Sequence, residues 1–245
     1  MSYVFANKEI TIMKLGILNA ISPEASVVNW GGTPVDTYIR FFESVNAPFT
    51  YAGYQVAQGQ FPTSPAECDA YIITGSPKGV YDTDDWIIVL SQFIRDSYRA
   101  GIKLVGICFG HQILAHALGG RAEKSKKGRN FGLKSFDIYQ QKAWMNGKPD
   151  RCSLYFAHQD QVVELPPEAE CLGGNTFCPI ALYEIDHRVL GIQGHPEFSR
   201  GIMQDLLSVM EKRLESSMYE AAVRSLDNGA PDNPLVAQWL VNFLL

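Results

Sequence analysis

The sequence has no long apolar run, no block of like charges and only five cysteines. Its purely apolar stretches, such as residues 87–90, are far shorter than the roughly 18 to 20 residues that a membrane-spanning helix requires. Acidic residues exceed basic ones by 26 − 21 = 5, and no basic run suits a phosphate backbone. The scattered cysteines, odd in number, are not typical of a disulfide-rich secreted domain. We therefore expect no membrane partner, no nucleic-acid partner and mainly reduced thiols.

The beginning of the sequence also lacks a targeting pattern. Residues 1–12 have neither the basic start nor the long apolar core of a secretory signal, which favours a cytoplasmic location. Met13 directly precedes the first strand-like run, so residues 1–12 are interpreted as an N-terminal extension, either a loose segment or the product of an upstream start codon. With 245 residues, 46% of them hydrophobic, and no internal repeat or interdomain linker, residues 13–245 are predicted to form a single domain.

Short apolar runs rich in Ile, Val and Tyr alternate with segments of helical period in the first half. The predicted strands are residues 15–19, 49–54, 70–74 and 104–107, and the predicted helices are 35–44 and 86–98. This alternation is typical of an α/β fold in which crossover helices connect parallel strands.

The pattern changes after Gly120, where strand-like runs follow one another without long helices. These runs are residues 136–139, 154–157, 180–185 and 189–193, and this part is expected to be partly antiparallel. From Arg200 apolar residues return at helical spacing, and residues 227–234 are predicted to be a flexible connection between helices.

Cys108 lies in residues 104–114, LVGICFGHQIL, where a buried-type strand turns into a helix. Gly106 and Gly110 leave space for a sharp turn, as in the Gly-x-Ser-x-Gly elbow of serine hydrolases. A thiol there projects from the carboxyl edge of the sheet and faces the positive end of the helix dipole, which favours a thiolate nucleophile. Taken alone, the cysteine fits a small buried residue equally well.

A second polar group follows the strand-like run at residues 189–193, in the stretch GIQGHPEF. In extended chain His195 and Glu197 project to the same side, so that the carboxylate can orient the imidazole as a proton carrier. Pairs of this kind are also common at exposed strand ends with no catalytic role.

The two stretches together resemble the class I glutamine amidotransferases, which have a Cys-His-Glu triad. The resemblance rests on G-x-C-x-G-x-Q followed about 85 residues later by G-H-P-E, and it is strongest to the stand-alone, GMP-synthase-like group. It implies a flavodoxin-like fold with a mostly parallel central sheet, flanking helices and a few antiparallel strands in the second half. It also implies that Cys108, His195 and Glu197 are the catalytic residues.

The resemblance assigns further residues to an oxyanion hole. Residues 72–82, IITGSPKGVYD, are similar to the glycine-rich loop that donates a backbone amide in this family. Ser76 stands at the donor position, where relatives often have glycine, and Phe109 would supply the second amide. Gly75 would line the substrate pocket.

The remaining pocket residues come from two segments. Gln112, one helical turn after Cys108, matches the substrate-binding glutamine of the family. Residues 155–162, YFAHQDQV, are similar to the family's S-H-G-D-x-V stretch, which places Ala157, His158, Gln159 and Asp160 at the substrate. Ala157 replaces serine and Gln159 replaces glycine, so the pocket is expected to be reshaped.

His111 is close enough in sequence to reach Cys108, but the resemblance puts the base at His195 and leaves His111 to shape the pocket. The histidines and the remaining cysteines show no zinc-ligand spacing, so no metal is expected, and no organic cofactor is implied. The chain has no Walker-type phosphate loop, so ATP-driven use of ammonia would require a separate synthetase subunit.

Three functions remain open from the sequence. The main one is hydrolysis of glutamine, or of another γ-glutamyl compound, through a Cys108 thioester, as in a glutaminase subunit. The alternatives are a stand-alone γ-glutamyl peptidase or hydrolase acting on small γ-glutamyl compounds, and a non-catalytic binding module on the same fold.

Overall fold

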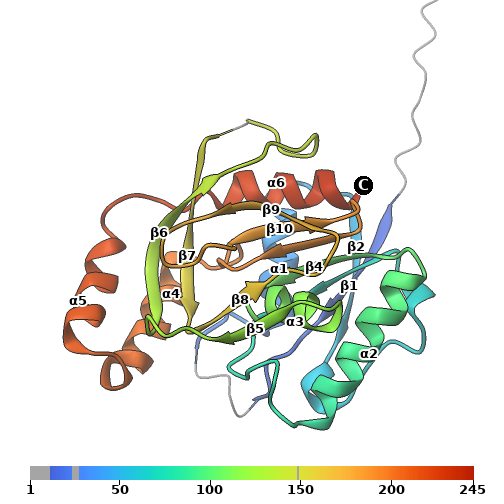
Figure 1. The fold of residues 1–245 in the computed structure, drawn as a ribbon, viewed down its shortest axis with the longest axis horizontal. Coiled ribbons are helices and arrows are strands. Elements are labelled where there is room, and N and C mark those ends of the chain that lie inside the picture. Colours follow the sequence, from blue (N-terminus) through green and yellow to red (C-terminus); the bar gives the residue numbers. More distant parts are fainter. Residues whose placement is uncertain (1–11, 24–27, 148) are drawn as a thin grey trace, which may run out of the picture.

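A nine-stranded mixed sheet lies at the centre of the protein (Figure 1). The computed structural model describes residues 12–23, 28–147 and 149–245. The strand order is β2-β1-β3-β4-β11-β10-β9-β6-β7. The parallel part consists of β2 (Phe49–Tyr54), β1 (Met13–Leu18), β3 (Ala70–Ile73), β4 (Lys103–Ile107) and β11 (Val189–Ile192).

The rest of the sheet is antiparallel. It consists of β10 (Leu182–Ile185), β9 (Ala169–Gly174), β6 (Asn130–Ile138) and β7 (Arg151–His158). A separate two-stranded sheet pairs β5 (Arg121–Lys124) with β8 (Asp160–Glu164). The α/β class, with parallel strands first and antiparallel strands later, is thus confirmed.

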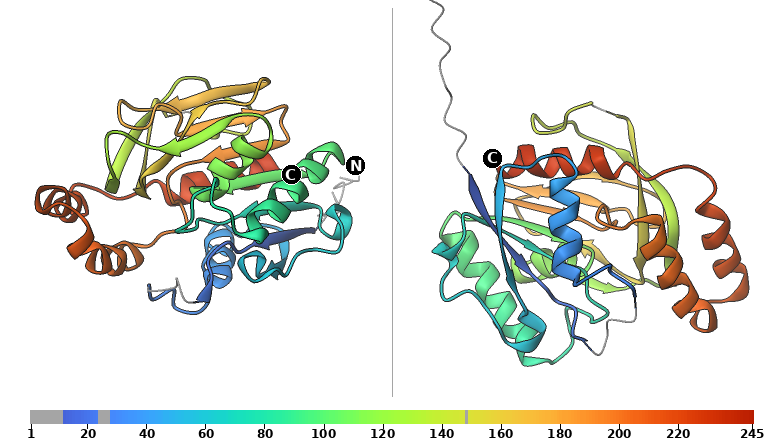
Figure 2. Two further views of the ribbon diagram at one scale, coloured as in Figure 1. Left: turned by 60° about the horizontal axis from the view of Figure 1, so that its bottom comes forward. Right: turned by 180° about the vertical axis from the view of Figure 1, so that it is seen from behind.

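Two helices cover each face of the large sheet (Figures 1 and 2). On one face lie α1 (Pro34–Glu43) and α6 (Asn233–Leu244), and on the other lie α2 (Asp85–Arg99) and α3 (Phe109–Ala117). Helix α1 begins at a capping box in which Thr33 and Asp36 satisfy each other's backbone amides, with Pro34 in the first turn. Short 3-10 turns occur at η2 (Val56–Gln58), η3 (Pro65–Glu67) and η4 (Glu211–Arg213).

A third apolar cluster lies beyond the sheet, under α4 (Arg200–Met210) and α5 (Ser216–Ser225). Ser199 caps α4 by accepting a hydrogen bond from the amide of Ile202. Helix α5 packs against β6, where Gly132 leaves no room for a side chain because a Cβ there would lie 2.3 Å from Ser225 Oγ. This contact holds α4 and α5 beside the start of β6 (Figure 1).

Several elements differ from the sequence prediction. The expected strand at 136–139 is only the end of β6, and β5, β8 and β9 are not among the predicted strands. The strands β5, β8 and β9 carry Arg, Lys, Glu, Asp, Gln and Gly, and their pairing partners rather than local apolar runs determine them. The predicted connection 227–234 ends at Asn233, where α6 begins, and Asp232 is hydrogen-bonded to Ser153 of β7. The predicted N-terminal extension lies outside the described residues except for Ile12.

No helix within the described residues has both the length and the apolar composition needed to cross a membrane. No group of three or more His, Cys, Asp or Glu side chains in the same part of the chain is arranged to hold a metal ion. The five cysteines are all unpaired.

Candidate active site

Cys108 occupies the turn between β4 and α3 in a strained backbone conformation. Its φ is 54° and its ψ is −103°, which non-glycine residues rarely adopt. The turn needs both flanking glycines, because a Cβ on Gly106 would lie 2.3 Å from the backbone of Gly110, and one on Gly110 would lie 2.3 Å from the carbonyl oxygen of Ile73. The predicted elbow at Cys108 is therefore confirmed.

The carboxyl ends of three neighbouring parallel strands bring the candidate residues together. β4 lies between β3 and β11 in the sheet, and Ile107 pairs in register with Ile192. The loop after β3 contains Gly75, and the chain after β11 leads to His195. Because adjacent parallel strands end at one edge, these segments meet at Cys108. A Cβ on Gly75 would lie 3.8 Å from Cys108 Cβ and 3.0 Å from His195 Cε1.

His195 is held on three sides. Its amide donates to the carbonyl of Tyr155, its Nδ1 lies 2.8 Å from Glu197 Oε1, and its ring stacks on Phe198 with 4.0 Å between centroids. Burial by itself lowers the pKa of His195, but the charges of Glu197 and Cys108 outweigh burial and raise this pKa to about 10. The predicted sharing of one side by His195 and Glu197 is confirmed, and the imidazole is poised to carry a proton.

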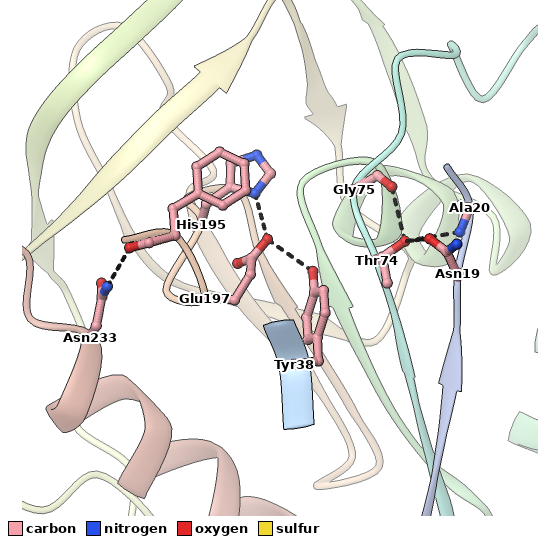
Figure 3. A network of polar contacts seen from close by, with 9 residues as sticks. Asn19, Ala20, Tyr38, Thr74, Gly75, His195, Glu197 and Asn233 are labelled. Atoms are coloured by element: carbon pink, nitrogen blue, oxygen red, sulfur yellow. Dashed lines mark hydrogen bonds and ion pairs between the residues drawn. The ribbon is translucent and has the colours of Figure 1, made fainter. Parts of the chain in front are cut away.

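Tyr38 is a further member of this network that the sequence analysis missed (Figure 3). Its hydroxyl donates to Glu197 Oε1 at 3.0 Å, and the ring is buried on α1. Burial, together with the neighbouring Glu197 charge, raises the pKa of Tyr38 well above its usual value, so the hydroxyl remains a donor. In the sequence Tyr38 is only one apolar position of a helix, and nothing local links it to a residue 159 positions away.

Hydrogen bonds of the Thr74 hydroxyl, which also contacts the side chain of Asn19, hold the loop after β3 in place (Figure 3). Thr74 Oγ1 accepts from the amide of Ala20 at 2.9 Å and donates to the carbonyl of Gly75 at 3.0 Å. Ser76 then accepts a hydrogen bond on its side-chain oxygen from the amide of Lys78. The hydroxyl of Ser76 thus shapes its own turn, and the loop carries it to the same cavity as Cys108.

The segment that contains His158 and Asp160 is organised around one carbonyl. The Asp160 carbonyl oxygen accepts from Gln112 Nε2 at 2.7 Å and lies 2.9 Å from His158 Nδ1. His158 Nε2 lies 3.2 Å from the side-chain amide of Asn130, and burial lowers the pKa of His158 to about 4. His158 is therefore neutral near pH 7 and fixes the segment rather than acting as a charged ligand.

A cavity of about 580 Å³ joins these residues. Cys108, Gly75, Ser76, Gln112, Ala157, His158, Gln159, Asp160, His195 and Glu197 all line it, so the structure brings these predicted residues together. Phe109 directly follows Cys108 as the first residue of α3, and its ring packs against Trp86 in the core rather than lining the cavity. The volume lies within the ~300–1,000 Å³ typical of small-molecule sites.

His111 is oriented away from this chemistry. Its side chain is fully buried, and its ring lies 4.9 Å from that of Tyr183 in the core. Burial lowers the pKa of His111 to about 3, so the ring is neutral near pH 7.

Tyr81 is a second residue of the cavity wall that the sequence analysis missed. Its hydroxyl donates to Asp160 Oδ2 at 2.6 Å.

Comparisons with known proteins agree with this arrangement. The sequence model of the family described as "Glutamine amidotransferase class-I" matches residues 33–208. A protein named "Gamma-glutamyl peptidase 3" from Arabidopsis thaliana is 30% identical over 223 residues, which are 85% of this chain and 90% of that protein. A glutamine amidotransferase structure from Thermotoga maritima has a TM-score of 0.74 at 18% identity, covering 95% of this chain and 98% of that chain, and shows the same fold.

The likeness to GMP synthases is narrower. The "GMP synthase [glutamine-hydrolyzing]" of Enterococcus faecalis is 34% identical over 127 residues. The match covers 51% of this chain and 23% of the synthase. The resemblance to GMP synthases noted from the motifs thus holds at a greater evolutionary distance than that to the peptidase, which spans most of both chains.

Proposed function

Because the chain belongs to the class I glutamine amidotransferase family, we propose that it is a γ-glutamyl hydrolase that cleaves small γ-glutamyl compounds through a thioester on Cys108. The observation that carries this proposal is the placement of His195, paired with Glu197 at 2.8 Å, against the elbow that presents Cys108. A nucleophile, a proton carrier and an orienting carboxylate in this order are the elements of thiol acyl transfer.

In the first step Cys108 Sγ attacks the δ-carbonyl carbon of the γ-glutamyl group. The carbonyl oxygen becomes an oxyanion, which the backbone amides of Ser76 and Phe109 would stabilise. The His195 imidazolium transfers its proton to the departing amine nitrogen as the C–N bond breaks. The amine leaves, and the γ-glutamyl group remains bound to sulfur as a thioester.

In the second step water replaces the amine. His195, now neutral, takes a proton from the water as its oxygen attacks the thioester carbon. The C–S bond breaks, glutamate is released, and the thiolate with its imidazolium partner is restored. Glu197 keeps the His195 ring in place through both transfers and stabilises its positive charge.

The amino-acid end of the substrate would lie against Gln112 and residues 157–160. Gln112 Nε2 donates to the Asp160 carbonyl and to Gln193 Oε1, which leaves the Gln112 carbonyl oxygen and the Asp160 carboxylate as acceptors for an α-ammonium group. Gly75 gives this end close access to Cys108, and Ala157, His158 and Gln159 complete the wall.

One observation favours a γ-glutamyl peptide over glutamine as substrate. A relative that matches 85% of the chain at 30% identity is named a γ-glutamyl peptidase. The competing proposal, a glutaminase subunit that passes ammonia to a separate synthetase, is favoured by the name of the family and by the likeness to GMP synthases over half of the chain.

The test is a steady-state assay of the purified chain on glutamine and on a series of γ-glutamyl dipeptides. We expect release of the second amino acid from the dipeptides at a higher kcat/KM than ammonia from glutamine. Cys108→Ala is the blank, and Cys171→Ala is the matched control, since Cys171 is a thiol outside the cavity lining. Mass spectrometry of an acid-quenched reaction should place a γ-glutamyl adduct on Cys108.

Other outcomes would replace the proposal. Inactivity on every dipeptide, followed by glutaminase activity once a synthetase is added, would establish the subunit function. Binding of γ-glutamyl compounds without turnover or adduct would establish a binding module. Full activity of Cys108→Ala would exclude the thioester.

A further inference from the structure

One part of the cavity wall carries none of the residues used above. It contains the apolar side chains of Phe131, Leu206 and Met210 and the cationic side chains of Lys124, Arg129 and Arg213, and we call these six residues the outer subsite. Phe131 and Met210 belong to the apolar cluster under α4 and α5, and Leu206 packs against it. The family match ends at residue 208, so Met210 and Arg213 lie beyond it.

The outer subsite lies on the side of the cavity where a leaving group must depart. His195 stacks on Phe198, and Phe198 belongs to the same apolar cluster as Phe131 and Met210. A leaving nitrogen has to lie within hydrogen-bond reach of His195 to receive its proton. Whatever is attached to that nitrogen therefore extends along the outer subsite, and the glutamyl end lies next to it, near Gln112 and Ala157, since Phe131 pairs with Ala157 in the register of β6 and β7.

The charges of the outer subsite are unbalanced. Neither Arg129 nor Arg213 forms an ion pair with any residue that the structure describes, whereas the nearby Arg200 and Arg224 pair with Asp227 and Glu220. Lys124 likewise forms no ion pair with a described residue, but it is paired with Asp160 in the register of β5 and β8, next to the proposed glutamyl end. The two arginines are thus the cations of the outer subsite that have no strand partner at the glutamyl end.

Each arginine also stands beside an apolar residue of the wall. Arg129 lies two positions before Phe131 at the start of β6, and Arg213 follows Met210 in η4, directly after α4. A ligand held here meets an apolar surface and a guanidinium group together. Guanidinium groups bind carboxylates through paired, charge-assisted hydrogen bonds.

We propose that the outer subsite binds a leaving group that combines an apolar side chain with a carboxylate, and that Arg129 and Arg213 determine this specificity. A γ-glutamyl dipeptide with an apolar second residue and a free C-terminus has this chemistry. The inference rests on the proposed γ-glutamyl hydrolysis and adds the class of leaving group. Because the rim is open to solvent, the expected contribution of each arginine is moderate.

The experiment compares two substrates that differ only in the carboxylate. These are γ-glutamyl-leucine and γ-glutamyl-3-methylbutylamide, which has the same apolar group and no carboxylate, and γ-glutamyl-alanine reports on the apolar wall. The variants are Arg129→Gln, Arg213→Gln and the double variant. The matched control is Arg224→Gln, which removes an exposed arginine of α5 outside the cavity lining.

We expect the native protein to prefer γ-glutamyl-leucine over both other compounds in kcat/KM. The double variant should lose about tenfold on γ-glutamyl-leucine, as expected for two charge contacts that solvent can reach, and stay within about twofold on the methylbutylamide. Arg224→Gln should behave as the native protein on all three.

Three results would overturn the inference. One is an equal loss on the leucine compound and the methylbutylamide, which would mean that the arginines bind the glutamyl carboxylate. Another is a native protein without preference between these two substrates. If no γ-glutamyl compound is hydrolysed, the proposed function fails, and the outer subsite is then tested by binding alone. Calorimetry would measure the affinity of the same two compounds for Cys108→Ala, with and without the two arginines. The third result against the inference is an equal affinity of Cys108→Ala for both compounds.

Discussion

The two sides of the cavity are built in different ways. On the side of Cys108, backbone meets backbone at the ends of β3, β4 and β11, and the closest approaches leave no room for a Cβ at Gly106 or Gly110. On the side of α4, the wall consists of side chains from β6 and from helices outside the large sheet. The first side tolerates few substitutions, whereas the second can change without disturbing the elbow. The fold thus separates the chemistry from the choice of leaving group.

The strongest test of the catalytic residues compares His195, which is close to Cys108 in space, with His111, which is close to it in sequence. His195→Ala removes the only histidine with a raised pKa among the described residues that line the cavity, and we expect a loss of about 10³-fold or more in kcat/KM. His111→Ala removes a core side chain whose pKa is about 3, so it should lower the thermal midpoint but reduce kcat less than about tenfold. Kinetic assays with parallel thermal unfolding measure both.

The opposite ranking of the two variants would contradict the assignment of His195 as the proton carrier. A severe loss in His111→Ala together with a mild loss in His195→Ala would make His111 the base. The side of the cavity assigned to the leaving group would then have no support, because that assignment depends on His195.

Glu197→Gln should produce a smaller loss and a shift of the pH profile. The native pKa of His195, about 10, is the net result of lowering by burial and raising by the charges of Glu197 and Cys108. Activity should therefore fall as the pH rises through about 10, where the imidazolium loses its proton. Without the carboxylate charge burial is opposed less, the pKa falls, and this alkaline limb should move to lower pH.

The measurement is kcat/KM between pH 5 and 11 for the native protein and for Glu197→Gln. We expect a loss of about 10- to 100-fold near pH 7, less than for His195→Ala, because an orienting group contributes less than the proton carrier. Glu220→Gln, on the surface of α5, is the control. Two profiles that differ in height but share the same alkaline limb would show that Glu197 does not act through the charge of His195.

Gly75→Ala tests whether the chemical side is as crowded as its backbone contacts indicate. The added methyl group would lie 3.0 Å from His195 Cε1, so the ring has to shift by a few tenths of an ångström from its place on Phe198. We expect kcat to fall about tenfold, since acyl transfer is sensitive to small displacements of the reacting groups. Gly201→Ala, at the exposed start of α4 where a Cβ meets only Ser199 Oγ at 3.7 Å, is the control and should stay near native. Native kcat in Gly75→Ala would contradict the close packing.

The same difference explains what the sequence could predict. Gly106, Cys108 and Gly110 lie within one short stretch because a single sharp turn requires them, and His195 and Glu197 are two residues apart on one strand end. Such local patterns can be read before the chain is folded. Arg129 and Met210 come together only through the pairing of β6 and the packing of α4, and no local pattern in the sequence links these two distant segments. The outer subsite was therefore invisible in the sequence, although the elbow was not.

The smallest predicted effect concerns Tyr38, which reaches the chemical side from the far face of the sheet. Its hydroxyl donates to Glu197 Oε1, while Glu197 Oε2 is buried with no hydrogen-bond partner among the described residues. Tyr38→Phe leaves His195 as the remaining partner of that carboxylate. A hydrogen bond to a charged group contributes about 1.5–3 kcal/mol, so the thermal midpoint should fall by several degrees.

Activity separates a positioning role of Tyr38 from a purely structural one. If the hydroxyl holds Glu197 at the angle that orients His195, kcat should fall about three- to tenfold in Tyr38→Phe while KM stays within about twofold, because the hydroxyl is engaged by Glu197. Tyr51→Phe is the matched control, since the Tyr51 hydroxyl is buried without a hydrogen-bond partner in the described part of the chain, and its removal should leave both stability and kcat unchanged. A lowered midpoint with native kcat in Tyr38→Phe would limit Tyr38 to the core and leave His195 and Glu197 oriented by the strand end alone.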